Sequence, residues 1–127
     1  MISALALAAL ISVSDAPRVE IVAPPEPAFC EFNRNQARPC YVMGVTIDNG
    51  EGVGLSVYDP TNERTITVLG VDPKAGSFAI LGILMHEQNQ IVPVNYGVCQ
   101  KRGSVVECQA FLEASRQVYS LRVQLSQ

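Results

Sequence analysis

Short runs rich in Val, Ile, Leu, Thr and Tyr, separated by turn residues at fairly even spacing, fill the chain beyond residue 40. This pattern is typical of strands that form a β-sandwich or a barrel. The Asn49-Gly50 pair predicts a hairpin between two runs, and Pro60 predicts a type I turn between two others. The predicted strands cover residues 41–48, 53–58, 64–69, 77–84, 90–94, 98–102, 105–110 and 118–125.

Alternation within the runs predicts which strands are exposed on one face. In the last run Tyr119, Leu121 and Val123 share one face, while Ser120 and Arg122 share the other. One side of this strand should therefore face the core and the other side water. The stretch 78–84 is apolar on both faces, which predicts a central strand. Only residues 111–117 have a helical pattern, and this segment is short.

The first 13 residues form an uncharged apolar run that suits the hydrophobic region of a signal peptide. The run is well below the ~20 residues that span a bilayer. Small residues follow, so we expect a leader peptidase to cut between Ser14 and Ala16. The alternative is a cytosolic protein with a buried N-terminal helix. Because Ala and Leu occur on every face of the run, no polar stripe marks a solvent side for such a helix.

Residues 17–29 are rich in proline and are expected to form a stiff extended linker or an edge segment. The chain therefore divides into a signal peptide (1–16), the proline-rich segment (17–29) and a single β domain (30–127). This organisation predicts an extracytoplasmic protein, periplasmic or secreted, with no transmembrane span in the mature chain.

Four cysteines in a short exported chain favour disulfides over zinc or redox chemistry. They are Cys30, Cys40, Cys99 and Cys108. A two-residue turn on Gly103-Ser104 places Cys99 opposite Cys108 at a non-hydrogen-bonded pair, where a bridge can form. Cys30 then pairs with Cys40. The rival pairing, Cys40 with Cys99, would suit an immunoglobulin sandwich, but the sequence has no tryptophan to pack on such a bridge.

Taken together, these patterns predict an all-β fold. We expect an antiparallel sandwich or small barrel of about seven or eight short strands with one short helix. Two disulfides should stabilise it, because each short bridge contributes roughly 2.7 kcal/mol in the loop-entropy treatment.

Candidate chemistry is sparse. The net charge of −3 is small and the cations are scattered, so no nucleic-acid partner is expected. The neighbours of His86, the only histidine, supply no nucleophile and no orienting carboxylate, so we interpret it as a solvated turn residue. A calcium loop counted from Asp48 would place Val53 where glycine is required. Ser56 lies in a strand pattern and lacks the second glycine of a nucleophile elbow. We predict no catalytic residue, no cofactor and no metal site.

The function that these features favour is a non-enzymatic binding or interaction module of the cell envelope, with an envelope protein as a possible partner. The alternative is a small extracytoplasmic enzyme or enzyme inhibitor whose site is assembled only by folding. A cluster of His86 with two carboxylates in a pocket would favour the enzyme.

If a loop carries recognition, we expect it to be one hairpin tip. A bridge behind this tip would restrict its conformations before binding, and two adjacent cations would suit an acidic partner or the acidic pocket of a protease. The residues of the tip are Lys101, Arg102, Gly103 and Ser104.

Overall fold

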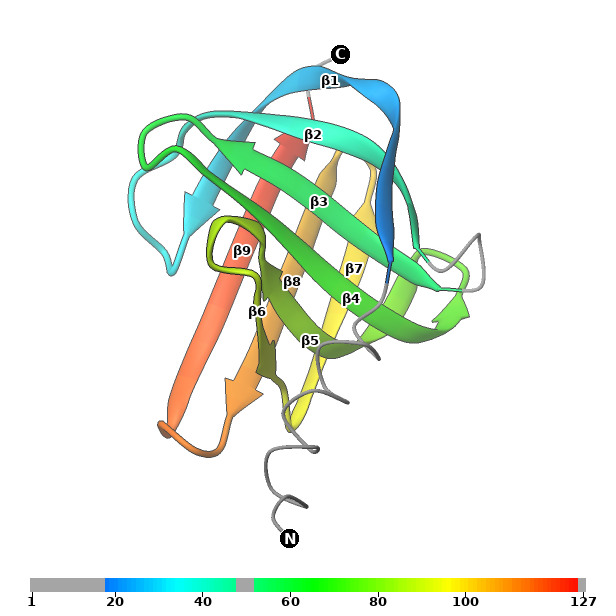
Figure 1. The fold of residues 1–127 in the computed structure, drawn as a ribbon, viewed down its shortest axis with the longest axis vertical. Coiled ribbons are helices and arrows are strands. Elements are labelled where there is room, and N and C mark those ends of the chain that lie inside the picture. The colour runs from blue at the N-terminus through cyan, green and yellow to red at the C-terminus, as the bar shows by residue number, and fades with distance from the viewer. Residues whose placement is uncertain (1–17, 48–51, 126–127) are drawn as a thin grey trace, which may run out of the picture.

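The computed structural model describes residues 18–47 and 52–125, and nearly all of these residues lie in antiparallel strands (Figure 1). The signal peptide predicted over 1–16 and the predicted Asn49-Gly50 hairpin lie outside the described residues. The strands are β1 (Val19–Phe32), β2 (Arg38–Ile47), β3 (Val53–Asp59), β4 (Arg64–Lys74), β5 (Ser77–Met85), β6 (Gln90–Pro93), β7 (Tyr96–Arg102), β8 (Val105–Leu112) and β9 (Gln117–Leu125).

The strands close into a barrel. Their hydrogen-bonded order is β4-β3-β2-β1-β9-β8-β7-β5-β6, and β4 also pairs with β5, so the sheet returns onto itself. Strands β6 and β7 share one edge of β5, because β6 pairs with residues 82–85 and β7 with residues 77–79. The predicted all-β antiparallel fold is confirmed.

All eight strands expected from the sequence are present as β2 to β9. The helix expected at 111–117 is wrong, since β8 continues to Leu112, a turn follows, and β9 begins at Gln117. Phe111 pairs with Val118 across this hairpin and Leu112 is buried, so cross-strand packing extends both strands through the segment. The helical element that the described residues do contain is the 3₁₀ turn His86–Gln88.

The proline-rich segment forms the first part of β1. This part pairs with β2, with irregularities in register on both sides of Ala23, and from Ala28 onward β1 also pairs with β9. Proline has no N–H to donate, so it is tolerated where one edge of a strand is left without a partner strand. The segment thus begins as a sheet edge and ends as part of the barrel wall.

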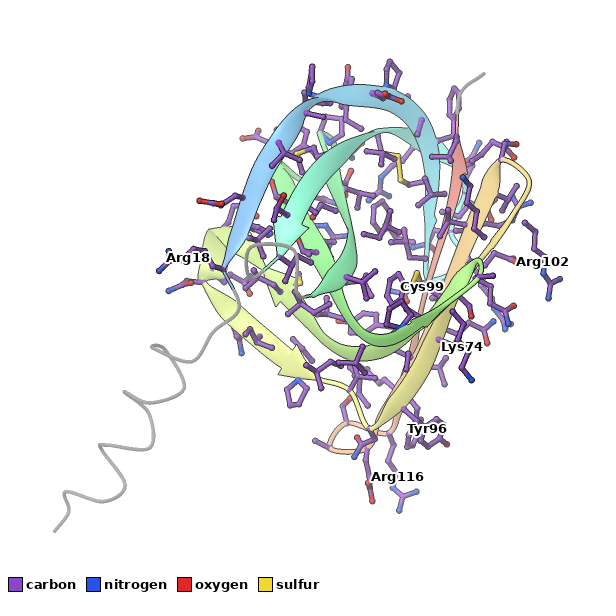
Figure 2. The ribbon with its side chains drawn as sticks, turned by 90° about the vertical axis from the view of Figure 1, so that its right-hand side faces the viewer. Arg18, Lys74, Tyr96, Cys99, Arg102 and Arg116 are labelled. Atoms are coloured by element: carbon purple, nitrogen blue, oxygen red, sulfur yellow. A yellow bond between two sulfur atoms is a disulfide. The ribbon has the colours of Figure 1, made fainter. Side chains whose placement is uncertain are left out.

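Side chains from every strand except the short β6 contribute buried residues to the main core inside the barrel: β1, β2, β3, β4, β5, β7, β8 and β9. The end-on view shows these side chains pointing inward (Figure 2). Ile80 and Leu121 are both buried in it. A second cluster lies on the outer surface, because consecutive residues of a strand, such as Val68 and Leu69, point to opposite faces. Its buried members are Ile47, Leu69 and Leu84, with Val19, Val45 and Ile91 packed against them.

Both disulfides join neighbouring strands, and the predicted pairing is confirmed. Cys30 is bonded to Cys40 across β1 and β2, and Cys99 to Cys108 across β7 and β8. The register of β7 and β8 also matches the prediction, with Cys99 facing Cys108 at a Cα–Cα distance of 4.0 Å. Gly103 has a φ of 60°, which a type II′ turn requires at its first central residue. This connectivity rules out the immunoglobulin-like pairing.

Candidate binding site

The hairpin tip proposed for recognition is largely exposed, and a backbone hydrogen bond on each side connects it to a neighbouring segment. The backbone N–H of Lys101 donates to the carbonyl of Gly76 at 2.7 Å, and the carbonyl of Ser104 accepts from the N–H of Leu125 at 2.7 Å. The side chain of Arg102 is exposed and bonds Gln100 in its own strand. These bonds fix the position of the tip, and its role in binding a partner stays a prediction.

His86 is not the solvated turn residue expected from its sequence context. It is half-buried against the outer face of the barrel, where its Nε2 lies 2.7 Å from the hydroxyl of Thr67. That hydroxyl is also 2.6 Å from the buried hydroxyl of Ser56. Burial lowers the pKa of His86. The negative charge of Glu87 acts in the other direction but offsets only part of this effect. The chain of two hydroxyls and an imidazole therefore joins β3, β4 and the 3₁₀ turn.

The groups near His86 are already hydrogen-bonded or buried. The carboxylate next to it, Glu87, accepts the backbone N–H of Thr65 at 2.7 Å. Ser56 is almost fully buried, so a substrate could not reach its hydroxyl. Within residues 18–47 and 52–125, no three His, Cys, Asp or Glu side chains are grouped so that they could hold a metal ion.

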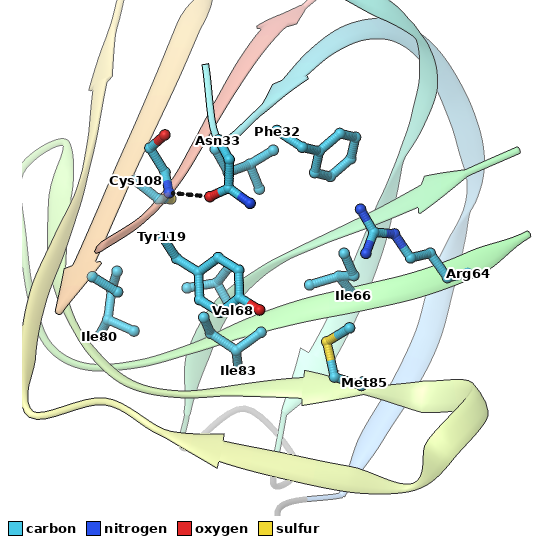
Figure 3. Close-up of a pocket in the computed structure, with 13 residues that line it drawn as sticks. Phe32, Asn33, Arg64, Ile66, Val68, Ile80, Ile83, Met85, Cys108 and Tyr119 are labelled. Atoms are coloured by element: carbon cyan, nitrogen blue, oxygen red, sulfur yellow. Dashed lines mark hydrogen bonds between the residues drawn. The ribbon is translucent and has the colours of Figure 1, made fainter. Parts of the chain in front are cut away.

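The clearest concave site is inside the barrel. A space of about 70 Å³ opens at the end of the barrel where β1 and β3 finish, and most of its wall is apolar (Figure 3). The mouth carries polar side chains, and Figure 3 shows Arg64 and Tyr119 on opposite sides of it. The deeper wall consists of Ile66, Val68, Ile80, Ile83, Met85, Cys108, Ala110 and Leu121.

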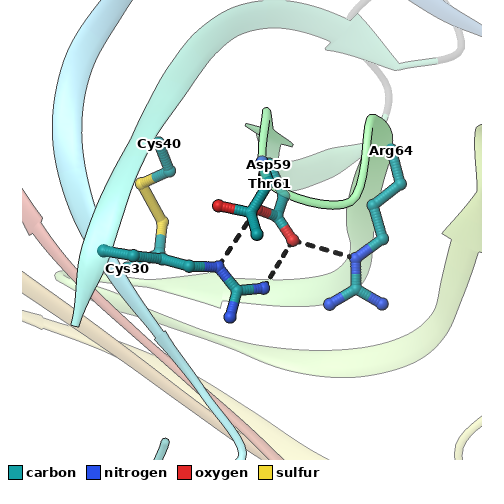
Figure 4. The surroundings of a disulfide bond; sticks show 6 residues. Cys30, Cys40, Asp59, Thr61 and Arg64 are labelled. Carbon is teal, nitrogen blue, oxygen red and sulfur yellow. Dashed lines mark hydrogen bonds and ion pairs between the residues drawn. A yellow bond between two sulfur atoms is a disulfide. The ribbon is translucent and has the colours of Figure 1, made fainter. Parts of the chain in front are cut away.

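An ionic cluster flanks the same mouth (Figure 4). The carboxylate of Asp59, which is fully buried, accepts from Arg38 Nη2 at 2.6 Å and from Arg64 Nε at 3.2 Å. It also accepts the backbone N–H of Thr61 and the side-chain amide of Asn62. Burial by itself would raise the pKa of Asp59, but hydrogen bonds from Arg38, Asn62 and Arg64 and the charge of Arg38 lower it to about 2.

The ring of Phe32 connects this cluster to the lumen. The guanidinium carbons of Arg38 and Arg64 lie 4.8 and 5.0 Å from its centre, within the range of cation–π attraction. Phe32 and Arg64 both line the inner space. Sequence reasoning missed this group, because its residues come from β1, β2, β3 and β4 and no local spacing connects them. The one local feature of the sequence at this group is the Asp59-Pro60 pair, and that pair predicts a turn rather than an ionic cluster.

A hydrogen-bonded pair of segments closes the other side of the mouth. The backbone N–H of Asn33 donates to the carbonyl of Ser120 at 2.8 Å. In return, the side-chain oxygen of Asn33 accepts the N–H of Ser120 at 3.1 Å, the bond drawn in Figure 3. Next to this pair, Tyr119 is 38% exposed, although it belongs to the inward face of β9. These two hydrogen bonds therefore hold the backbone in place on this side of the mouth.

A second hollow lies on the outer surface and is a weaker candidate. It measures about 380 Å³, but it is open to solvent and is lined by only four of the described residues. These are Pro25, Tyr41, Met43 and Tyr58. A ligand there would keep most of its surface in water, whereas good small-molecule sites enclose most of their ligand.

No helix among the described residues is long and apolar enough to cross a membrane. Comparisons of the chain with models of known families, with curated proteins and with solved structures found no match. The chemistry of the barrel mouth itself is thus the basis on which a function can be assigned.

Proposed function

We propose that the protein is a non-enzymatic binding module that holds the apolar part of a small molecule in the barrel lumen. The observation that carries this proposal is the apolar space between β4, β5, β8 and β9, which reaches the surface beside Arg64. Eight-stranded barrels are just wide enough to be filled by side chains or to hold one small ligand. Here the filling is incomplete on one side, which leaves room for a ligand.

The size of the space limits what can enter. An apolar cavity of about 150 Å³ holds a benzene molecule. The lumen has about half this volume, and it is open at one end. It therefore suits the end of an alkyl chain or the edge of a small ring, with the remaining carbons and the head group of the ligand at the mouth.

The proposed compartment is outside the cytoplasm. The two disulfides are compatible with an oxidising location, and buried bridges of this kind are rare in the cytosol. Removal of a leader over residues 1–16 is part of this proposal.

Filling the lumen should abolish binding. Ala110 lies on the wall of the space, and Ala110→Leu adds three carbon atoms where a ligand would sit. We expect this change to lower the affinity for 1-octanol, measured by titration calorimetry, at least tenfold. The melting temperature should change by only a few degrees, because the new side chain occupies existing space.

Ala79→Leu is the matched control. Ala79 is on the opposite face of β5, since its neighbours Phe78 and Ile80 belong to the core, and it adds the same three carbons outside the lumen. The control should bind 1-octanol like the wild type. Equal binding by wild type and Ala110→Leu, or no binding by wild type, would overturn the proposed function.

A further inference from the structure

The guanidinium of Arg64 stands at the lumen with part of its hydrogen-bonding capacity unused. Among the described residues that line the space, Arg64 is the only one with an ionised side chain. Its bond to Asp59 uses Nε, and its terminal nitrogens make no hydrogen bond to the described residues. Contact with the Phe32 ring keeps the group against the wall. The outer edge of the guanidinium is thus available to a ligand.

The charge of this cluster is not balanced. Among the described residues, Asp59 is the only carboxylate paired with Arg38 or Arg64, which leaves one positive charge in excess within the cluster. The oxygens of Asp59 already accept five hydrogen bonds, from Arg38 twice, Thr61, Asn62 and Arg64. The side chain of Arg64 is only 33% exposed, so water screens the excess charge less than at an open surface. An anion at the mouth would compensate it.

The other polar groups at the mouth can also donate. Because the Asn33 oxygen accepts the N–H of Ser120, the amide nitrogen of Asn33 remains as a donor. Figure 3 shows Tyr119 across the space from Arg64, with its hydroxyl at the end of the ring nearer to Arg64. Two neutral donors and one guanidinium match a head group that only accepts hydrogen bonds.

We propose that the lumen binds a small amphipathic carboxylate, with the end of its alkyl chain between Ile66 and Leu121 and its carboxylate on Arg64 at the mouth. This inference rests on the proposed function and names its ligand class. A carboxylate carries one negative charge and accepts two parallel N–H bonds from a guanidinium. One excess cation suits such a monoanion better than a doubly charged phosphate ester.

The test compares octanoate with 1-octanol at pH 7 by titration calorimetry, using the whole mature protein. The two ligands share a chain length and differ in the charge of the head group. We expect octanoate to bind at least tenfold more tightly to the wild type, although octanol is the more hydrophobic ligand. Arg64→Gln should weaken octanoate binding about tenfold, the value of one charge-assisted bond, and weaken octanol binding by less because octanol carries no charge, so that the preference for octanoate falls.

Two further variants separate the head-group site from effects on folding. Tyr119→Phe removes a donor without changing charge, and it should weaken octanoate binding severalfold and octanol binding by less. Arg102→Gln removes a cation from the tip at the opposite end of the barrel and should have no effect. The melting temperature of each variant shows whether it folds.

Equal affinities for octanoate and octanol in the wild type would overturn the carboxylate inference and leave the proposed function standing. An Arg64→Gln variant that keeps the wild-type preference would overturn it as well. If neither ligand binds, both the proposed function and this inference fail.

Discussion

Reduction of both disulfides is expected to lower the free energy of unfolding by about 5 kcal/mol. Each bridge closes a short loop, with sequence separations of 10 and 9, and each should contribute roughly 2.7 kcal/mol by restricting the unfolded chain. Small domains are stable by only about 5–15 kcal/mol, so reduction should remove at least about a third of the stability of the protein. Urea titration with and without dithiothreitol measures the difference.

Two double variants measure how much each disulfide contributes to the free energy of unfolding. Cys30→Ala with Cys40→Ala, and Cys99→Ala with Cys108→Ala, should each lose about half of the stability that full reduction removes. Alanine is the suitable replacement because all four positions are buried and a serine hydroxyl would lack a partner there. A loss below about 1 kcal/mol on full reduction would show that the barrel is held by packing alone.

Replacement of Asp59 by Asn is expected to cost about 3 kcal/mol at pH 7. The change removes the buried negative charge that Arg38 and Arg64 share and leaves two cations next to the Phe32 ring with no carboxylate between them. Loss of one partner from a fully buried ion pair costs about 3–5 kcal/mol, and the lower end applies here because both arginines are partly exposed. Chemical denaturation at pH 7 gives the value.

The same carboxylate predicts a pH dependence. The pKa of Asp59 is lowered to about 2, against about 3.9 in an unfolded chain, so the unfolded state takes up the proton first as pH falls. The stabilisation is complete above about pH 5, and about 2 kcal/mol of it should be lost as the pH falls to 2. Asp59→Asn should lack this component.

Glu107→Gln is the control for loss of an acid. Glu107 is exposed on the outer face of β8 and pairs with Arg122 at 3.5 Å, so its loss should change stability by less than about 0.5 kcal/mol. If Asp59→Asn has an effect as small as this control, the cluster does not stabilise the mouth in the way described.

Local features of the chain were enough to predict much of the fold. The Gly103-Ser104 turn determines the register of β7 and β8 and therefore the Cys99–Cys108 bridge, because a two-residue turn fixes every pair behind it. The prediction of a helix from Phe111 onward was wrong, because the residues there make their contacts across the hairpin with β9 rather than along one helix face.

The binding site could not be predicted in this way. Asp59 looked like a turn residue, and it does accept the N–H of Thr61 within its own turn. Its more important bonds go to Arg38, which is 21 positions earlier in the chain. Arg64 reaches the lumen only because β4 pairs with both β3 and β5. Contacts that form only when the barrel closes cannot be recognised from the spacing of residues along the chain.

The most direct test of the lumen site uses the two methionines of the described residues. Met85 lines the lumen. Met43 lies on the outer face of the barrel at the second hollow, where neighbouring side chains cover most of it. In protein labelled with ¹³C at the methionine methyl groups, octanoate should shift the Met85 signal and show nuclear Overhauser contacts between Met85 and its chain. The Met43 signal should stay in place. A shift of Met43 with Met85 unmoved, or no shift of either at saturating octanoate, would contradict binding inside the barrel.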